Sequence, residues 1–494
     1  MQSTRAQSPF SSLVFWLCAA GLASLAVTAF FYFHPLLGLW LALLAAVTYL
    51  RPAWGASILL FVLSMDTVAP LPGGIQVSFS ELQLASGLLA FLARTRGRDL
   101  DWRPVLWGAP FLAAVALSGA VNIEWYKVFP HLARASEWLA ACFLTLNAFS
   151  ERGSLRRVRW VVAGAGVFYC IAGFLQFPHA LAGRIFSYFT NPNQFAGYLG
   201  MLFPFFVMFF FTTAGRRIRP VWGYLALLTL FSMVASASRT ALLSLVACLP
   251  VLWWLHYRNK LRNFLHGPFS TAGRFVQRSG RAVALHGLTA GLALFLALWL
   301  GGFDSLARRV ESGFTPRSTG IVDSMTGHRL PFFRLGLQVW KEHWLLGVGP
   351  GRWEEAVEAR LPSTQDWAIA NPKLFERNAL IHCHNLYIQL GSVYGLLGLL
   401  AFLFWITQTL RQLASAWSGW SCAGVGLVVA FLVHNMFDVT FPSLGQEMGC
   451  LIGLALAGPG RAQQVRKEYR LDSQRGFELQ KRSANAPKPA RNPG

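Results

Sequence analysis

The stretch NLYIQLGSVYGLLGLLAFLFWITQ, residues 385–408, contains no charged side chain and is long enough to cross a bilayer as a helix. Similar apolar runs recur along the whole chain. Hydrophobic residues make up 54% of the sequence and charged residues only 13%, whereas soluble domains carry about 25% charged residues. A soluble protein can bury one or two such runs but not about a dozen. The sequence therefore predicts an all-α polytopic membrane protein.

The candidate spans differ in length, and several are short. We therefore predict about 12–14 transmembrane helices. The apolar runs lie at 12–33, 36–50, 53–69, 80–93, 104–121, 129–148, 160–177, 194–213, 220–237, 240–256, 284–302, 385–408, 419–437 and 444–458.

Basic residues account for the formal net charge of +22. They fall in short clusters between apolar runs, at 94–103, 151–159, 216–219 and 258–281. With both termini in the cytoplasm, all these clusters lie on the cytoplasmic side, as the positive-inside rule requires. A nucleic-acid-binding protein would gather its charge on one surface, so we expect no nucleic acid as a partner.

The apolar runs divide the chain into four regions. We expect transmembrane helices with short loops in 1–302, a large periplasmic loop in 303–383, further transmembrane helices in 384–460, and a disordered basic cytoplasmic tail in 461–494. Within the loop, apolar residues Leu330, Phe333, Leu337 and Trp340 predict an amphipathic helix over His328–Trp344. The sequence GVGPGRW, residues 347–353, then predicts a turn. A loop of this size is more often functional than passive.

Four polar stretches fall on the predicted periplasmic face. Their convergence at helix ends predicts a functional site there. They are GRIFSYFTNPNQFAGYLG (183–200), SASRTALLSL (236–245), TGHRLPFFRLGLQVW (326–340) and HCHNLYIQLGSVYGLLG (382–398).

Two arginines in these stretches are candidate anion ligands. Arg239 lies between two apolar runs without an acidic neighbour in sequence, and Arg329 opens the amphipathic helix. A guanidinium grips a phosphate through two parallel hydrogen bonds. Alternatively, Arg239 lies at the membrane interface and reaches the lipid headgroups. The alternative for Arg329 is an ordinary charge on the surface of the helix. Arg184 is a further candidate.

His384 heads a predicted span and is a candidate general base, because neutral histidine accepts protons near neutral pH. The alternative is a capping or interfacial histidine. His382 and Asn385 are candidate substrate contacts beside it. Asn191 and Asn193 in TNPNQ either cap the next helix or contact substrate. Because adjacent side chains rarely converge on one ion and no CxxC or HExxH spacing is present, we expect no metal.

The motifs together resemble the O-antigen ligase and O-antigen polymerase superfamily. The resemblance rests on His384-Asn385 and, after nine intervening residues, Gly395-Leu-Leu-Gly398. It rests also on SRT (238–240), on GHR (327–329) with Trp340 and WLLGVGPGRW (344–353), and on FTNPNQFAGYL (189–199). It extends over roughly 180–460.

The resemblance implies a GT-C-like helical enzyme that needs no metal or cofactor. Such an enzyme moves a glycan from undecaprenyl diphosphate to an acceptor hydroxyl on the periplasmic face of the bacterial inner membrane. His384 would deprotonate the acceptor, and Arg239 and Arg329 would hold the diphosphate. The acceptor would be lipid A-core for a ligase or another lipid-linked glycan for a polymerase, and the sequence leaves both open.

Two other classes of protein fit the sequence less well. A transporter of a small anion such as bicarbonate should carry polar groups near the middle of the bilayer, whereas here they gather at one face. A structural scaffold explains neither Arg239 nor the long loop.

Overall fold

The protein is described by a computed structural model. The described residues are 15, 18–22, 35–63, 68–70, 76–122, 125–149, 154–176, 184–189, 191–213, 215, 217–265, 329–360, 380–416, 418–441 and 444–458. The predicted span 284–302, much of the loop 303–383 and the tail 461–494 lie outside them.

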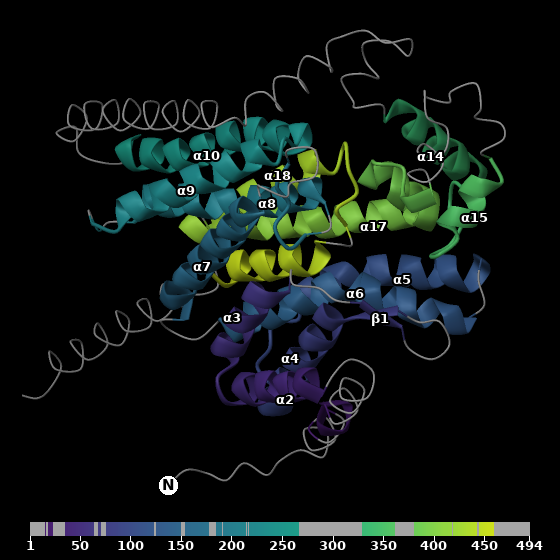
Figure 1. Ribbon diagram of the computed structural model, residues 1–494, viewed down its shortest axis with the longest axis horizontal. Helices are drawn as coiled ribbons and strands as arrows, with labels where there is room; N and C mark the ends of the chain where they lie inside the picture. Colours follow the sequence, from purple (N-terminus) through teal and green to yellow (C-terminus); the bar gives the residue numbers. More distant parts are fainter. Residues whose placement is uncertain are drawn as a thin grey trace, which may run out of the picture.

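Helices dominate the described part of the chain, and most of the longer ones run side by side (Figure 1). Residues 445–458 form a further helix. The helices with assigned labels are α2 (Pro35–Leu50), α3 (Pro52–Val62), α4 (Phe79–Thr95), α5 (Arg103–Asn122), α6 (Trp125–Ala148), α7 (Ser154–Leu175), α8 (Pro192–Thr212), α9 (Arg219–Ala235), α10 (Arg239–Leu265), α14 (Leu330–Glu342), α15 (Trp353–Glu358), α17 (Leu386–Ala416) and α18 (Gly419–His434).

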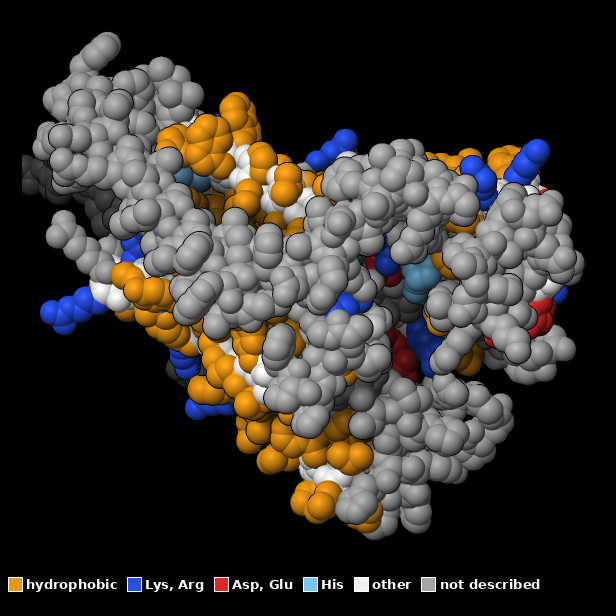
Figure 2. Space-filling view, turned by 45° about the horizontal axis from the view of Figure 1, so that its top comes forward, with side chains coloured by type: hydrophobic (Ala, Val, Ile, Leu, Met, Phe, Trp, Pro, Cys, Tyr) orange, Lys and Arg blue, Asp and Glu red, His pale blue; other side chains and the backbone are white. Residues whose placement is uncertain are grey.

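The lengths and composition of these helices confirm an all-α polytopic membrane protein. Five described helices are long and apolar enough to cross a membrane, namely α5, α7, α8, α17 and the Arg239–Arg258 part of α10. Shorter apolar helices are α2, α3, α9 and α18. Large apolar side chains are exposed on the outside of the bundle (Figure 2), as expected of a surface that faces lipid.

The prediction of a single span over 53–69 is wrong for the second half of this run. Helix α3 ends at Val62, and the chain then forms a two-stranded antiparallel sheet of β1 (Val68–Pro70) and β2 (Gln76–Ser78). The sequence PLPGG (70–74), which starts at the last residue of β1, is rich in turn-forming residues, which do not sustain a helix. Ser78 then starts α4 through a capping box with Glu81.

Helices α8, α10 and α18 form the centre of the bundle, and close contacts at glycines fix their directions. A Cβ on Gly197 of α8 would approach His434 of α18, and one on Gly426 of α18 would approach Pro204 of α8 and Leu252 of α10. Helix α18 therefore runs antiparallel to α8 and α10. The starts of α8 and α10 and the end of α18 lie at the same end of the bundle, which we call the site end.

The last described helix, residues 445–458, packs closely on α6. Gly445, Gly449 and Gly453 recur every fourth residue, and a Cβ on Gly449 would lie 2.1 Å from the carbonyl oxygen of Trp138. Small residues at this spacing let two membrane helices approach through their backbones. This contact joins the C-terminal helix to the N-terminal half of the chain.

Helix α17 is broken at Gly395, whose φ of +71° and ψ of −172° are not helical. Gly391, Gly395 and Gly398 have the small size that suits close helix packing in a membrane. Gly391 is packed in this way, since a Cβ there would meet the ring of Trp340 of α14. Gly395 instead provides a backbone conformation that side chains rarely allow.

The turn Trp344–Gly349 satisfies the backbone groups that this break exposes. The N–H of Leu396 donates to the carbonyl of Trp344 (2.8 Å), while the carbonyls of Ser392 and Val393 accept from Val348 (2.9 Å) and Gly349 (3.0 Å). Side chains of α5 hold the same turn, because Ser118 donates to the carbonyl of Leu346 and Asn122 to that of Gly347. The turn thus locks α14, α17 and α5 together (Figure 1).

The amphipathic helix predicted over His328–Trp344 is confirmed as α14, but its buried stripe is rotated from the predicted one. Phe332, Leu335, Gly336 and Val339 are buried, whereas Leu337 is 48% exposed. The helix carries apolar residues on both sides of this stripe. The small residue Gly336 decides which side packs, because Cys383 and Ile388 lie against it.

We predict that Gly395→Ala strongly destabilises the protein. An alanine Cβ would lie 2.1 Å from the carbonyl oxygen of Leu345 and would require a positive φ, so at least about 1–3 kcal/mol of strain is expected. The midpoint of thermal unfolding in detergent measures this. Gly164→Ala in α7 is the control, since no atom lies within 4 Å of its Cβ position. Equal midpoints for the two variants would contradict the role of the break.

Candidate functional site

His384 lies directly before α17, and the start of that helix is tightly fixed. Asn385 caps the helix, with its side-chain oxygen accepting from the N–H of Ile388 (3.0 Å). Its amide group donates to the carbonyl of Met436 (2.9 Å). The N–H of Leu386 donates to the carbonyl of Asn435 (2.9 Å). These bonds tie His384 to the loop that follows α18.

The loop after α18 presents Asp438 to His384. Asn435 shapes the loop, because its side-chain oxygen accepts from both the backbone N–H (2.9 Å) and the hydroxyl (3.1 Å) of Thr440. The Asp438 carboxylate accepts from the N–H of Val439 at 2.9 Å. Asp438 is only 7% exposed, so its charge is held in a partly dehydrated place.

His384, Asp438 and Arg329 form one cluster. Nδ1 of His384 lies 3.9 Å from one carboxylate oxygen of Asp438, and a guanidinium nitrogen of Arg329 lies 3.5 Å from the other. Nδ1 is buried and has no hydrogen-bond partner among the described residues. His384 adopts a φ of +56°, which is uncommon for a residue with a side chain. Such outliers gather at functional sites.

Opposing charges keep Asp438 ionised. Burial alone would raise the pKa of its carboxyl group, but the contact with His384 and the positive charge of Arg329 hold the pKa well below its usual range. Asp438 is therefore a fixed negative charge next to His384.

His382 packs beside His384 but differs from it in environment. The two ring centroids lie 4.3 Å apart, and Nδ1 of His382 accepts from the backbone N–H of His384 (3.2 Å). Burial and the neighbouring His384 lower the pKa of His382 to about 4. His382 is thus neutral at physiological pH. Phe332 of α14 covers the other side of His384, at 4.9 Å between centroids.

A second polar group lies at the starts of α8 and α10. Arg184 donates to the backbone carbonyl of Ser236 (2.8 Å) and to the side-chain oxygen of Asn193 (2.9 Å). Asn191 caps α8 by accepting from the N–H groups of Asn193 and Gln194. Arg239 is the first residue of α10 and is half-buried. The structure therefore places Arg184, Asn193 and the start of α10 side by side.

His434 lies between the two groups. It is 2% exposed in α18, and a Cβ on Gly197, one turn beyond Asn193, would lie 3.3 Å from its Nε2. Neither ring nitrogen of His434 has a hydrogen-bond partner among the described residues. All the predicted site residues thus lie at the site end. Figure 2 shows a hollow in which histidine, basic and acidic side chains surface together.

His382, His384 and Asp438 also have the geometry of a possible metal site. Their candidate ligand atoms all lie within 4.8 Å of one another. The expectation that neighbouring side chains do not converge was wrong for these two histidines, because Cys383 is buried in the core and the two rings meet edge to face. However, the guanidinium of Arg329 lies 3.5 Å from the same carboxylate, where it would repel a cation. That no metal takes part stays a prediction.

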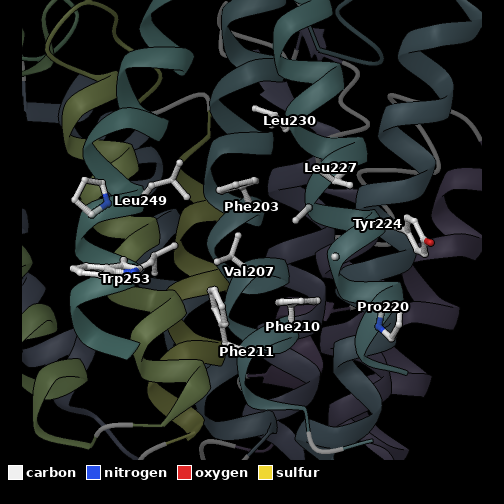
Figure 3. A pocket seen from close by; sticks show the side chains of 14 residues that line it. Phe203, Val207, Phe210, Phe211, Pro220, Tyr224, Leu227, Leu230, Leu249 and Trp253 are labelled. Atoms are coloured by element: carbon white, nitrogen blue, oxygen red, sulfur yellow. The ribbon is translucent and has the colours of Figure 1, made fainter. Parts of the chain in front are cut away.

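An apolar groove of about 910 Å³ lies on α8, α9 and α10, further from the site end. Figure 3 shows Phe203, Val207 and Phe210 of α8 between side chains of α10 on one side and of α9 on the other. The groove begins ten residues beyond Asn193, about 15 Å along α8. The same three helices thus carry polar groups at one end and an apolar groove beyond it.

Sequence reasoning missed Asp438 and His434 as members of the site. Both lie near the end of an apolar run, and neither is close in sequence to the four polar stretches. The position of a charged residue, Asp438, next to a membrane span was the one feature of the sequence that could have indicated its role. Asn191 and Asn385 are engaged in capping, so their roles as substrate contacts stay predictions.

Comparison with known families relates part of the chain to one of them. No curated protein matches the chain. Residues 223–403 match the family described as O-Antigen ligase. The match contains Arg239, Arg329, His382 and His384, and it favours no transporter. Through residues 223–403 the chain is similar to the O-antigen ligase family, in agreement with the resemblance of its motifs.

Proposed function

We propose that the protein transfers a glycan from undecaprenyl diphosphate to an acceptor hydroxyl on the periplasmic face of the inner membrane, without a metal. The observation that supports this most directly is the contact of His384 with Asp438 beside Arg329. This contact brings together the proposed base, a carboxylate that would orient it, and a cation at the end of a membrane helix.

In this mechanism Asp438 orients His384. A neutral imidazole with its proton on Nδ1, facing the carboxylate 3.9 Å away, leaves Nε2 as the proton acceptor. The contact is longer than a hydrogen bond, as is common in catalytic sites without substrate. The acceptor hydroxyl would give its proton to Nε2 as its oxygen bonds to the anomeric carbon. The bond from that carbon to the diphosphate would break, and undecaprenyl diphosphate would leave.

Arginines would hold the leaving diphosphate. The Arg329 side chain is 16% exposed and approaches Asp438 no closer than 3.5 Å, so it can turn to a more negative ligand. Arg239 is the first residue of α10, where the helix N-terminus also favours an anion. Such preorganised donors typically contribute about 10²–10³ in rate.

The apolar groove supports a donor with a long hydrocarbon chain. It lies on the helices that begin at Asn193 and Arg239 (Figure 3), so one molecule can place its diphosphate at the site end and its isoprenoid chain against Phe203 and Leu249. Burial of that chain would contribute about 25 cal/mol for each Å² removed from water.

The test is glycan transfer from an undecaprenyl-diphosphate donor in membranes, comparing wild type with His384→Ala at matched expression. Loss of the base should lower the rate by about 10²–10⁴-fold. His343→Ala is the matched control, since His343 is an exposed histidine at the end of α14. It should keep the wild-type rate within about twofold.

Equal rates in wild type and His384→Ala would refute the assignment of the base. A chelator arm in the same assay tests the metal. Excess chelator should leave transfer intact, and loss that added zinc or magnesium restores would assign His382, His384 and Asp438 to a metal instead.

The pH dependence separates the two neighbouring histidines. Because the pKa of His382 is lowered to about 4, this side chain carries no charge above about pH 5. His382→Gln should therefore leave the midpoint of the acidic limb of the rate profile unchanged between about pH 5 and pH 8. A displaced midpoint would show that His382 titrates in this range.

A further inference from the structure

A second cluster of arginines lies at the end of the bundle opposite the histidines. It surrounds a cavity of about 350 Å³ whose lining includes Arg51, Arg94 and Arg157 and no acidic residue. Helix α7 begins at this cavity and runs 22 residues, about 33 Å, toward the site end. Gln176 after that helix bonds to the carbonyl of Ser187, near Arg184. The two clusters are therefore separate.

Arg94 is held in place by the end of α2. Its guanidinium donates to the carbonyls of Tyr49 (2.7 Å) and Leu50 (2.8 Å), the last residues of that helix. Carbonyl groups at a helix C-terminus carry partial negative charge. Some of the hydrogen-bond donors of Arg94 are thus already paired, and its guanidinium is held in place as one fixed wall of the cavity.

The other two arginines increase the positive potential. Neither side chain has a hydrogen bond or an ion pair to a described protein group. Arg51 is the N-cap of α3 and makes no capping bond through its side chain, and Arg157 lies in the first turns of α7. The positive end of a helix dipole repels a basic side chain, so an arginine at a helix N-terminus adds to the positive potential there. Two guanidinium groups, two helix N-termini and no carboxylate together favour an anion.

The rim of the cavity is apolar and suited to the membrane interface. Trp54, which also lines the cavity, is 54% exposed, and Leu50 is 64% exposed. Tryptophan gathers where headgroups meet hydrocarbon. The ligand that matches both features has a phosphate for the arginines and acyl chains for the rim.

We propose that this cavity binds the phosphate headgroup of an anionic phospholipid. Arg51 and Arg157 hold the phosphate, with Arg94 as the fixed wall. Basic pockets between membrane helices bind such headgroups in the same way. The site is distinct from the proposed glycan-transfer site, because it lies at the other end of the bundle.

Native mass spectrometry of the purified, detergent-solubilised protein tests the site, with phosphatidylglycerol or zwitterionic phosphatidylcholine added. Wild type should bind phosphatidylglycerol in preference. Arg51→Gln with Arg157→Gln should weaken this binding by at least about tenfold, since the charge-assisted bonds are lost. The control double variant Arg156→Gln with Arg217→Gln removes two exposed arginines that do not line the cavity, and it should bind as wild type does.

Equal binding by the two double variants would overturn the proposal. So would binding of inorganic phosphate, with the same dependence on Arg51 and Arg157, without preference for the phospholipid. If the Arg51 and Arg157 double variant does not fold, the single variant Arg157→Gln decides. Phosphatidylglycerol should raise the midpoint of thermal unfolding of wild type more than that of Arg157→Gln, and equal shifts would contradict the site.

Discussion

The backbone clasp between the break in α17 and the turn Trp344–Gly349 is the constraint on which the site depends. A helix broken inside a membrane protein leaves carbonyl and N–H groups that must find partners. Here they find them in a turn that directly follows α14, through bonds of 2.8–3.0 Å to Trp344, Val348 and Gly349. The clasp fixes α14 against α17, and so it sets Arg329 at the start of one helix against His384 at the start of the other.

The charges at the site end follow from this framework. Asp438 is buried, and its carboxylate is stable there because His384 and Arg329 approach its two oxygens. Arg329 therefore has two candidate partners, the carboxylate in the free protein and the proposed diphosphate. An exchange between them would release Asp438 to interact more closely with His384 as the donor binds. On this account the donor helps to assemble the base that the acceptor needs.

Much of the fold was predictable because each span is specified locally. Runs such as 104–121 and 385–408 are mostly apolar and contain no charged residue, and the structure has helices there. The β1–β2 hairpin was not predicted, because pairing of strands as short as Val68–Pro70 has little local signal. The buried stripe of α14 was also mispredicted. Packing at Gly336 decides it, and that contact joins residues about 50 positions apart.

The site was predictable only in part, for a related reason. His384, Arg329 and Arg239 stand out because charged or polar groups are costly at membrane helix ends. Asp438 and His434 did not stand out, since their importance comes from distant partners. Asn435, Met436 and Thr440 build the loop that carries Asp438, and Asn385 ties that loop to α17. The convergence of His382 and His384 was likewise invisible, because it depends on Cys383 turning into the core.

His384 and Asp438 should act as one unit, and a double-mutant cycle on glycan transfer can show whether they do. Wild type, His384→Ala, Asp438→Asn and the double variant would be compared at matched expression in membranes. A carboxylate that works through the histidine loses its effect once the histidine is gone. The account therefore predicts that the double variant is no slower than His384→Ala alone. Losses that multiply in the double variant would show that the two residues act independently, and would contradict the account.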